Sequence, residues 1–170
     1  MDLNQFIRIV PDFPKKGISF KDITPLLLDA KAREYCLEQL VIPLQELGVS
    51  KVVGVESRGF FFGMSIAREL GVGFVPVRKP DKLPYETLSQ SYELEYGTDT
   101  LEIHKDAIQP GDRVVLHDDV LATGGTAKAS CQLIESLGAE IVACSFLMEL
   151  GFLNGADQIN GHPIHVVLKY

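Results

Sequence analysis

Five short runs of apolar residues recur along the chain. They are Lys51–Val55, Phe74–Val77, Arg113–Leu116, Glu140–Met148 and Ile164–Leu168. Runs of this length, several of them rich in valine and isoleucine, predict buried strands. Because helical patterns alternate with these runs, we expect an α/β fold with a central parallel sheet flanked by helices.

Three segments carry apolar residues at the spacing of a helix. The first, residues 30–47, ends at Gly48 and contains Pro43, which predicts a kink or a break. The third segment, which begins near Ala127, ends at Gly138. The apolar stripes are Leu37, Leu40, Val41, Leu44 and Leu47 in the first segment, Phe62, Ile66 and Leu70 in the second, and Ala127, Cys131, Ile134 and Leu137 in the third.

The N-terminal residues do not follow this alternation. Residues 2–10 predict a short amphipathic helix that ends at Pro11. The next segment, 11–28, is rich in proline and glycine, and a segment this long without regular structure is usually functional. Its Gly17–Pro25 stretch suits either a flat heterocycle stacked on Phe20 or a packed N-terminal arm.

A second irregular region precedes the apolar run Arg113–Leu116. Residues 80–89 have no core pattern and predict a loop. Residues 90–96 and 100–105 flank Gly97-Thr98-Asp99 and predict a β-hairpin around that turn. We expect the loop and the hairpin together to form a lid over about residues 80–105.

Composition indicates one globular domain over residues 1–170. Of the 170 residues, 46% are hydrophobic and 23% are charged, which is sufficient for a substantial core. No apolar run reaches the ~18 residues needed to cross a membrane, and no secretory signal is apparent, so we expect a cytoplasmic protein without a membrane partner. The net charge of −7 argues against nucleic acid as a partner and requires a locally basic pocket for any polyanionic substrate.

Cysteine and histidine spacing does not predict a metal site. Cys36, Cys131 and Cys144 form no C-x-x-C motif, and we expect reduced thiols in the core. The histidines are His104, His117, His162 and His165. No two of them have the spacing of metal ligands, so we expect all four to be structural.

The most informative motif follows the Arg113–Leu116 run. Asp118 and Asp119 come first, then Ala122-Thr123-Gly124-Gly125-Thr126, then the third helical segment. The glycines allow close backbone approach, and amide groups at a helix start can bind a phosphate. The two carboxylates can accept hydrogen bonds from ribose hydroxyls. The alternative is an ordinary strand-to-helix turn with solvated acids.

Basic residues follow two other predicted strands. Arg58 follows the first run, and Arg78, Lys79 and then Lys82 follow the second. Because the carboxyl ends of parallel strands meet at one edge of a sheet, these residues predict a basic pocket beside the glycine loop. For Arg58 the alternative is a surface arginine.

The acidic and glycine-rich motif resembles the phosphoribosyl pyrophosphate (PRPP) site of the type I phosphoribosyltransferases. Four further segments resemble the adenine phosphoribosyltransferases within that family. They are Pro11–Pro14 with Gly17–Pro25, Glu56–Phe60, Arg78–Pro84 and Tyr92–Gly97. Order and spacing agree along essentially the whole chain.

This resemblance implies the type I phosphoribosyltransferase fold, with a hood over about residues 1–28 and a flexible hairpin lid. It implies a homodimer that converts adenine and PRPP to AMP and pyrophosphate in purine salvage. Mg²⁺ is the implied cofactor, carried by PRPP without a direct protein ligand. A cis peptide bond between Glu56 and Ser57 is also implied.

The resemblance also implies a role for each site residue. The 5-phosphate would be held by Ala122, Thr123, Gly124, Gly125 and Thr126, and the pyrophosphate by Ser57, Arg58, Arg78, Lys79 and Lys82. Adenine would be held by Ser19, Phe20, Lys21 and Tyr96. The catalytic residues would be Glu95, Arg58, Asp118 and Asp119.

Three positions depart from the commonest family pattern: Lys21 replaces an arginine, Asp81 a glycine, and His117 an apolar residue. Lysine keeps the charge of arginine but loses its planar fork, so the side-chain role at Lys21 is open. Two other functions remain: a phosphoribosyltransferase for another base, such as xanthine or hypoxanthine, or a regulator that binds PRPP without catalysis. The net charge disfavours a regulator that binds nucleic acid.

Overall fold

A computed structural model of the protein describes residues 1–93 and 97–170. The chain divides into two compact units, Met1–Gln39 and Leu40–Tyr170. The predicted hood, residues 1–28, lies inside the first unit, and the predicted lid lies inside the second. None of the helices in the described ranges has the length and apolar character of a membrane span.

The N-terminal unit contains an antiparallel strand pair. Its elements are η1 (Leu3–Phe6), β1 (Arg8–Pro11), β2 (Ser19–Asp22) and α1 (Thr24–Leu28). β1 pairs with β2, so that Arg8 lies opposite Asp22 and Val10 opposite Phe20. Helix α2 (Ala30–Val41) follows and ends two residues before Pro43, which lies within the short helix η2 (Ile42–Leu44). The predicted break is confirmed, because proline lacks the N–H that would continue the helix.

The predicted helix over residues 2–10 is wrong beyond its first turn. Asp2 accepts a hydrogen bond from the Asn4 N–H at 3.0 Å and caps η1. The β-branched residues Ile9 and Val10 then adopt extended backbone opposite β2. The segment after Pro11 likewise contains β2 and α1, so it does not lack regular structure.

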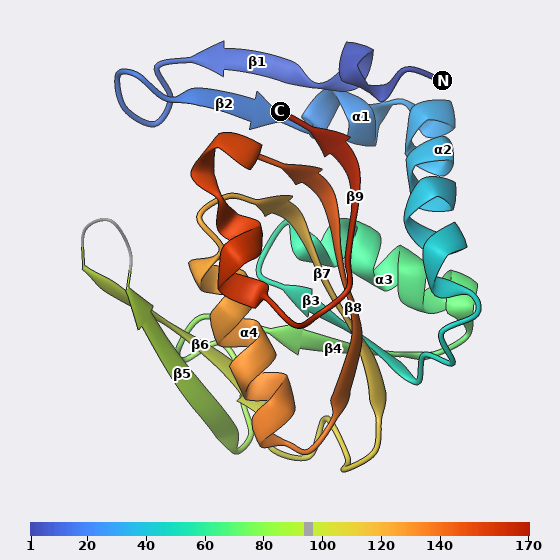
Figure 1. The fold of residues 1–170 in the computed structure, drawn as a ribbon, viewed down its shortest axis with the longest axis vertical. Helices are drawn as coiled ribbons and strands as arrows, with labels where there is room; N and C mark the ends of the chain where they lie inside the picture. The colour runs from blue at the N-terminus through green and yellow to red at the C-terminus, as the bar shows by residue number, and fades with distance from the viewer. Residues whose placement is uncertain (94–96) are drawn as a thin grey trace. The chain divides into compact units, whose positions relative to one another are not determined.

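The second unit is organised around a five-stranded sheet in the order β4-β3-β7-β8-β9 (Figure 1). The strands are β3 (Lys51–Val55), β4 (Gly73–Val77), β7 (Arg113–Leu121), β8 (Glu140–Glu149) and β9 (Ile164–Lys169). Every neighbouring pair is parallel. The predicted parallel sheet and its five strands are confirmed. Two 3-10 helices, η3 (Gly151–Leu153) and η4 (Gly155–Ile159), connect β8 to β9.

Helices α3 (Gly59–Leu70) and α4 (Gly125–Ser136) cover opposite faces of this sheet (Figure 1). β3 leads through α3 to β4 on one side, and β7 leads through α4 to β8 on the other. Because such crossovers are right-handed, connections that run in opposite directions place their helices on opposite faces. The core between these layers includes Cys131 and Cys144, free thiols whose sulfurs lie 3.8 Å apart, as expected for reduced residues.

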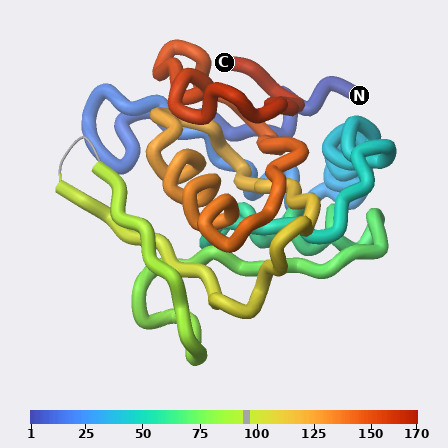
Figure 2. Tube along the Cα trace, turned by 60° about the horizontal axis from the view of Figure 1, so that its bottom comes forward, coloured from blue at the N-terminus to red at the C-terminus, as the bar shows by residue number. Residues whose placement is uncertain are grey.

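A β-hairpin packs beside α4 (Figure 2). It consists of β5 (Thr87–Glu93) and β6 (Thr98–His104). The hairpin is confirmed, but its predicted turn is wrong, because Thr98 and Asp99 belong to β6. The buried side chains of Leu101 and Ile103 join β6 to the core. β-Branched residues on both sides of Asp99 favour the strand over a turn.

Candidate active site

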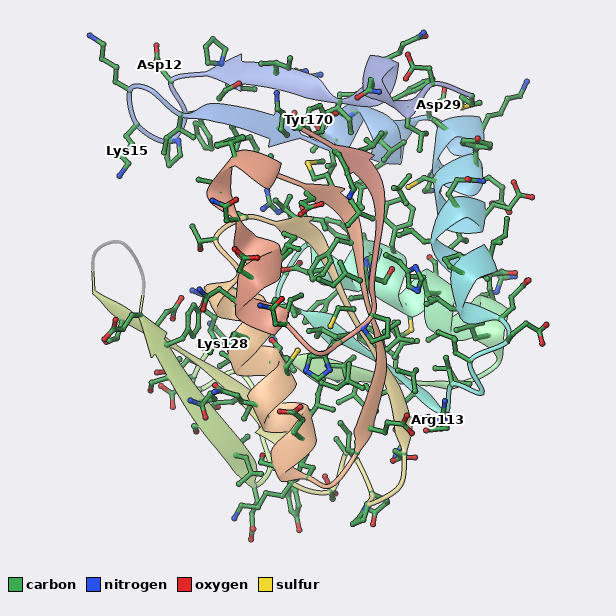
Figure 3. The ribbon with its side chains drawn as sticks, in the orientation of Figure 1. Asp12, Lys15, Asp29, Arg113, Lys128 and Tyr170 are labelled. Carbon is green, nitrogen blue, oxygen red and sulfur yellow. The ribbon has the colours of Figure 1, made fainter. Side chains whose placement is uncertain are left out.

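The connections that leave β3 and β7 run toward opposite edges of the sheet, since α3 leads from β3 to β4 and α4 leads from β7 to β8. The switch point of the sheet therefore lies between β3 and β7. In open α/β sheets, ligands bind at the carboxyl ends of the strands that flank this point. A cavity of about 370 Å³ lies there. Arg113 marks the opposite, amino end of β7 (Figure 3). The cavity is lined by Glu56, Ser57, Arg58, Lys79, Tyr92, Asp99, Leu101, Asp118, Asp119, Val120, Leu121, Ala122, Thr123, Gly124, Thr126 and Ala127.

The loop after β7 depends on two glycines in close contact. Gly124 has φ +83°, and a Cβ on it would lie 2.3 Å from the Gly155 carbonyl oxygen. A Cβ on Gly155 would lie 2.1 Å from the carbonyl oxygen of Ala122. A side chain at either position would therefore force the loop away from η4.

Gly124 is also the N-cap residue of α4, and no side chain caps this helix start. The first amide groups of a helix have no partner within the helix and carry a partial positive charge. Thr123 and Thr126 bring hydroxyl groups to the same cavity wall. This end of α4 has the donors that a phosphate monoester requires.

The acidic pair lies at the carboxyl end of β7. The Asp119 N–H donates to Asp118 Oδ1 at 2.9 Å. The Asp119 side chain is 3% exposed, and its Oδ2 forms an ion pair with Arg58 Nε at 3.0 Å. Burial and the neighbouring Asp119 charge raise the pKa of Asp118 well above its usual value. Burial also raises the pKa of Asp119, and the Arg58 charge limits that rise.

The acidic pair lies close to the start of α3. A Cβ on Gly59 would lie 2.9 Å from the His117 carbonyl oxygen and 3.0 Å from Asp118 Oδ1. Only glycine therefore allows this approach of the two loops. The Gly59 of the Ser57-Arg58-Gly59 sequence thus brings Arg58 within reach of Asp119.

The loop after β3 contains the cis peptide bond between Glu56 and Ser57 that the resemblance implies. Glu56 Oε2 accepts hydrogen bonds from the Lys79 N–H at 2.9 Å and from Arg78 Nε at 3.1 Å. Partial burial acts to raise the pKa of Glu56, but these hydrogen bonds outweigh it and the pKa is lowered. Glu56 thus joins the ends of β3 and β4.

The hairpin supplies the remaining wall. Tyr92 and Asp99 lie directly opposite each other across β5 and β6. The Tyr92 hydroxyl donates to Asp99 Oδ2 at 3.3 Å and accepts from Thr126 Oγ1 at 3.2 Å. Asp99 Oδ2 also forms an ion pair with Lys79 Nζ. These bonds connect the hairpin to both the glycine loop and the basic segment after β4.

Comparison with known proteins agrees with this geometry. The model of the phosphoribosyl transferase domain family matches residues 42–161. An adenine phosphoribosyltransferase of Flavobacterium johnsoniae is 61% identical over 170 residues, which are 100% of both chains. The chain belongs to the adenine phosphoribosyltransferase family.

Solved structures of this family have the same fold. The crystal structure of the adenine phosphoribosyltransferase from Thermoanaerobacter pseudethanolicus superposes with a TM-score of 0.96 at 56% identity, covering 99% of this chain and 98% of that one. The enzyme of Saccharomyces cerevisiae, solved with an imino-altritol bisphosphate and adenine, has a TM-score of 0.94 at 41% identity, covering 98% and 96%. The predicted type I phosphoribosyltransferase fold is confirmed.

The cavity brings together most of the residues that the family resemblance assigns to PRPP. Arg78 and Lys82 do not line it: Arg78 pairs with Glu56, and the Lys82 carbonyl accepts a hydrogen bond from Arg78 at 3.3 Å. Gly125, the first residue of α4, is also absent from the lining. The predicted residues that line the cavity are Ser57, Arg58, Lys79, Asp118, Asp119, Ala122, Thr123, Gly124 and Thr126.

The predicted adenine residues lie elsewhere in the chain. Ser19, Phe20 and Lys21 are part of β2 in the N-terminal unit, where Phe20 packs edge-on against Phe13 at 5.1 Å between ring centroids. Glu95 and Tyr96 lie outside the described residues. Their predicted roles stay predictions.

Sequence reasoning missed three polar residues of the cavity: Glu56, Tyr92 and Asp99. Glu56 could have been found from its position, because it directly follows a predicted strand and precedes Ser57 and Arg58. Tyr92 and Asp99 become neighbours only through the register of the hairpin. A hairpin prediction with β6 beginning at Thr98 would have placed the two opposite each other.

Proposed function

We propose that this protein transfers the 5-phosphoribosyl group of PRPP to adenine, yielding AMP and pyrophosphate for purine salvage. One observation carries the proposal: a helix start free of side-chain caps, a carboxylate pair with Asp119 buried, and two basic side chains share one cavity at the sheet's switch point. A phosphate, a ribose and a pyrophosphate, joined in that order, require these three kinds of group.

The roles of the cavity residues follow from their chemistry. Residues 122–126 would bind the 5-phosphate through amide and hydroxyl donors. Asp118 and Asp119 would accept hydrogen bonds from the ribose hydroxyls and lie near the positive charge that develops on the ribose. Ser57, Arg58 and Lys79 would stabilise the negative charge on departing pyrophosphate, with Arg78 and Lys82 behind them.

Mg²⁺ fits this cavity as part of the substrate. Within residues 1–93 and 97–170, no group of three histidine, cysteine, aspartate or glutamate side chains is arranged to hold a metal ion. Mg²⁺ prefers oxygen ligands, keeps several waters and commonly binds through substrate phosphates. Bound to the pyrophosphate group, it would neutralise part of the charge on that leaving group.

Adenine would be bound by residues from two separate stretches of the sequence. We assign adenine to Ser19, Phe20 and Lys21 of the predicted hood, and to Tyr96. Glu95 would take or shuttle the proton that adenine loses as its ring nitrogen attacks the ribose. Support for adenine comes from the relatives: the structure from Saccharomyces cerevisiae was solved with adenine and the one from Giardia lamblia with 9-deazaadenine.

A homodimer in the cytoplasm is the proposed setting. Phe61 and Met64 lie three positions apart on α3 and are 51% and 58% exposed, so this helix presents an apolar face to a second copy. One of the basic residues assigned to pyrophosphate, Arg78, Lys79 or Lys82, would reach the site of the other subunit across the dimer. The three free thiols suit a reducing compartment. Light scattering on the parent and on a Met64→Glu variant tests the dimer, and a monomeric parent would contradict it.

The deciding experiment is pyrophosphate release with PRPP, Mg²⁺ and one base at a time. Adenine should support release, while hypoxanthine and xanthine should be turned over at least about a hundredfold less efficiently, since a site built to hydrogen-bond one edge leaves its polar groups unpaired with another base. Equal rates with hypoxanthine or xanthine would favour another purine base. Binding of PRPP without turnover of any base would favour a regulator.

A further inference from the structure

Both basic side chains that line the cavity are already paired with a carboxylate, and so is Arg78, which does not line it. Arg58 pairs with Asp119, Arg78 with Glu56, and Lys79 with Asp99. A pyrophosphate group that enters must therefore share each of these cations with its carboxylate or displace the carboxylate. The described lining residues include four acids and two bases, so the cavity itself is not a basic one.

The Lys79–Asp99 pair differs from the other two. Asp119 and Glu56 are fixed at the carboxyl ends of β7 and β3, whereas Asp99 comes from the hairpin. The Asp99 side chain is 20% exposed and that of Lys79 50% exposed, so the lysine is the more accessible partner of this pair. Lys79 is thus the cation that an incoming anion can reach with the least rearrangement.

Asp99 is held in place by donors from three segments. Its Oδ1 accepts from the Thr100 N–H at 2.9 Å, and its Oδ2 accepts from the Tyr92 hydroxyl at 3.3 Å and from Lys79. The Tyr92 hydroxyl in turn accepts from Thr126 of the glycine loop. Asp99 presents to Lys79 a fixed negative oxygen, which is also what a pyrophosphate presents.

We propose that Asp99 is an internal competitor of pyrophosphate. It holds Lys79 in the cavity when pyrophosphate is absent, and its negative charge weakens the binding of pyrophosphate, so that the product leaves more easily. This inference rests on the proposed function, in which Lys79 contacts pyrophosphate. Asp99 is a positioning residue that acts through Lys79, because both anions require the same donor.

The charge can be removed with little change of shape. Asp99→Asn keeps one oxygen, which can still accept from the Thr100 N–H, and puts an uncharged amide group of the same size where Oδ2 accepts from Tyr92 and Lys79. Because like charges a few ångströms apart repel each other, and solvent at this partly exposed site screens most of that repulsion, we expect pyrophosphate to bind about threefold to tenfold more tightly. Product inhibition by pyrophosphate should strengthen by the same factor, and the gain should shrink as salt rises.

A matched control separates this local effect from net charge. Asp106→Asn removes one negative charge from the exposed turn after β6, outside the cavity. Its pyrophosphate affinity should stay within about twofold of the parent. Asp99→Ser, which also removes the charge, should match Asp99→Asn and serves if the asparagine variant folds poorly.

The measurement is calorimetric titration of each folded variant with pyrophosphate in excess Mg²⁺. Tighter binding by both Asp99 variants and not by the control supports the competitor. Unchanged or weaker binding would overturn it, because Asp99 would then only help to orient Lys79. The parent alone tests the proposed function: a parent that binds no pyrophosphate contradicts that function, whichever way the Asp99 variants behave.

Discussion

Two walls of the cavity are built in different ways. The first, the β7 wall, consists of the end of β7 and the residues that follow it, 118–127 without Gly125, and its position follows from one strand end and one helix start. The opposite wall is formed by the hairpin, where Tyr92 and Asp99 meet because of the pairing between β5 and β6. Local sequence determines the first wall, and register determines the second.

The two walls also differ in how firmly their polar groups are held in place. The β7 wall contains the backbone amides and the two carboxylates that belong to β7 itself, which cannot move without disturbing the sheet. The hairpin contacts the β7 wall through a hydroxyl hydrogen bond from Thr126 to Tyr92, and the segment after β4 through the Lys79–Asp99 ion pair. Both interactions are individually weak in water. Substitutions in the β7 wall should therefore reduce binding and stability most, unless the lid predicted from the sequence also supplies a catalytic group.

Glu95→Gln tests that exception, and its effect should be the largest. The glutamine keeps the size of the side chain but cannot take a proton from adenine. General acid–base assistance is typically worth about 10²–10⁴-fold, so kcat should fall by that factor. PRPP affinity without adenine should change little. A variant with normal kcat across the pH range would leave catalysis to the β7 wall.

Gly124→Val should abolish tight PRPP binding. Its Cβ would lie 2.3 Å from the Gly155 carbonyl oxygen, in a backbone conformation with φ +83°. Since such positions cost about 1–3 kcal/mol before any clash is counted, we expect more than a hundredfold loss of affinity, measured by calorimetry. Gly161→Val is the control, because Gly161 has φ +104° without any atom within 4 Å of its Cβ. Equal losses in the two variants would mean that strain alone, without the phosphate site, explains the result.

His117→Leu should change how stability depends on pH. His117, which precedes the acidic pair in β7, is fully buried, and neither ring nitrogen has a hydrogen-bond partner of normal geometry. Burial lowers the pKa of His117 to about 4, with a small opposing effect from the Ser145 backbone. The unfolded chain therefore binds more protons between its usual pKa near 6.5 and 4, and stability falls as pH decreases through that window.

The full effect corresponds to about 3 kcal/mol, since each pKa unit is worth about 1.4 kcal/mol. The leucine variant should lose this dependence and be at least as stable as the parent at pH 7, because an unpaired buried polar group is removed. Urea unfolding at pH 4.5 and 7 measures both quantities. Parallel pH profiles for parent and variant would show that His117 does not titrate as described.

Asp119→Ala should reduce kcat/KM by about tenfold to a hundredfold. Hydrogen bonds that involve charged groups contribute about 1.5–3 kcal/mol, and about 1.4 kcal/mol corresponds to tenfold. The variant also removes the partner of Arg58 at 3.0 Å. Steady-state kinetics with varied PRPP measure the change. If the kinetics match the parent, the acidic pair is only a turn beside the cavity.

Tyr92→Phe should have the smallest effect. It removes one hydroxyl that connects Thr126 to Asp99 at 3.2 and 3.3 Å. A typical hydrogen bond contributes about 1 kcal/mol, so the free energy of unfolding should fall by about that amount, measured with urea. A loss as large as that of Gly124→Val in PRPP binding would contradict the division between the two walls.

The same contrast explains how much was predictable from sequence. The five strands, the glycine loop and Arg58 beside the acids followed from periodicity and from the rule for parallel sheets. Asp99 was assigned to a turn, because no local pattern fixes where β6 begins. The error at residues 2–10 has the same origin: Ile9 and Val10 become a strand only by pairing with β2, which the local pattern cannot show.

The arrangement of β3 and β7 also determines what a fragment of this chain can retain. Lys51 pairs with Val114, and the cavity opens where these two strands end. The loop of Glu56–Arg58 and the loop of residues 122–126 therefore belong to distant parts of the chain that the sheet joins. A proteolytic piece that stops before β7 keeps the first loop but has nothing opposite it. Ligand protection against proteolysis accordingly reports on an intact β3–β7 pair rather than on either loop alone.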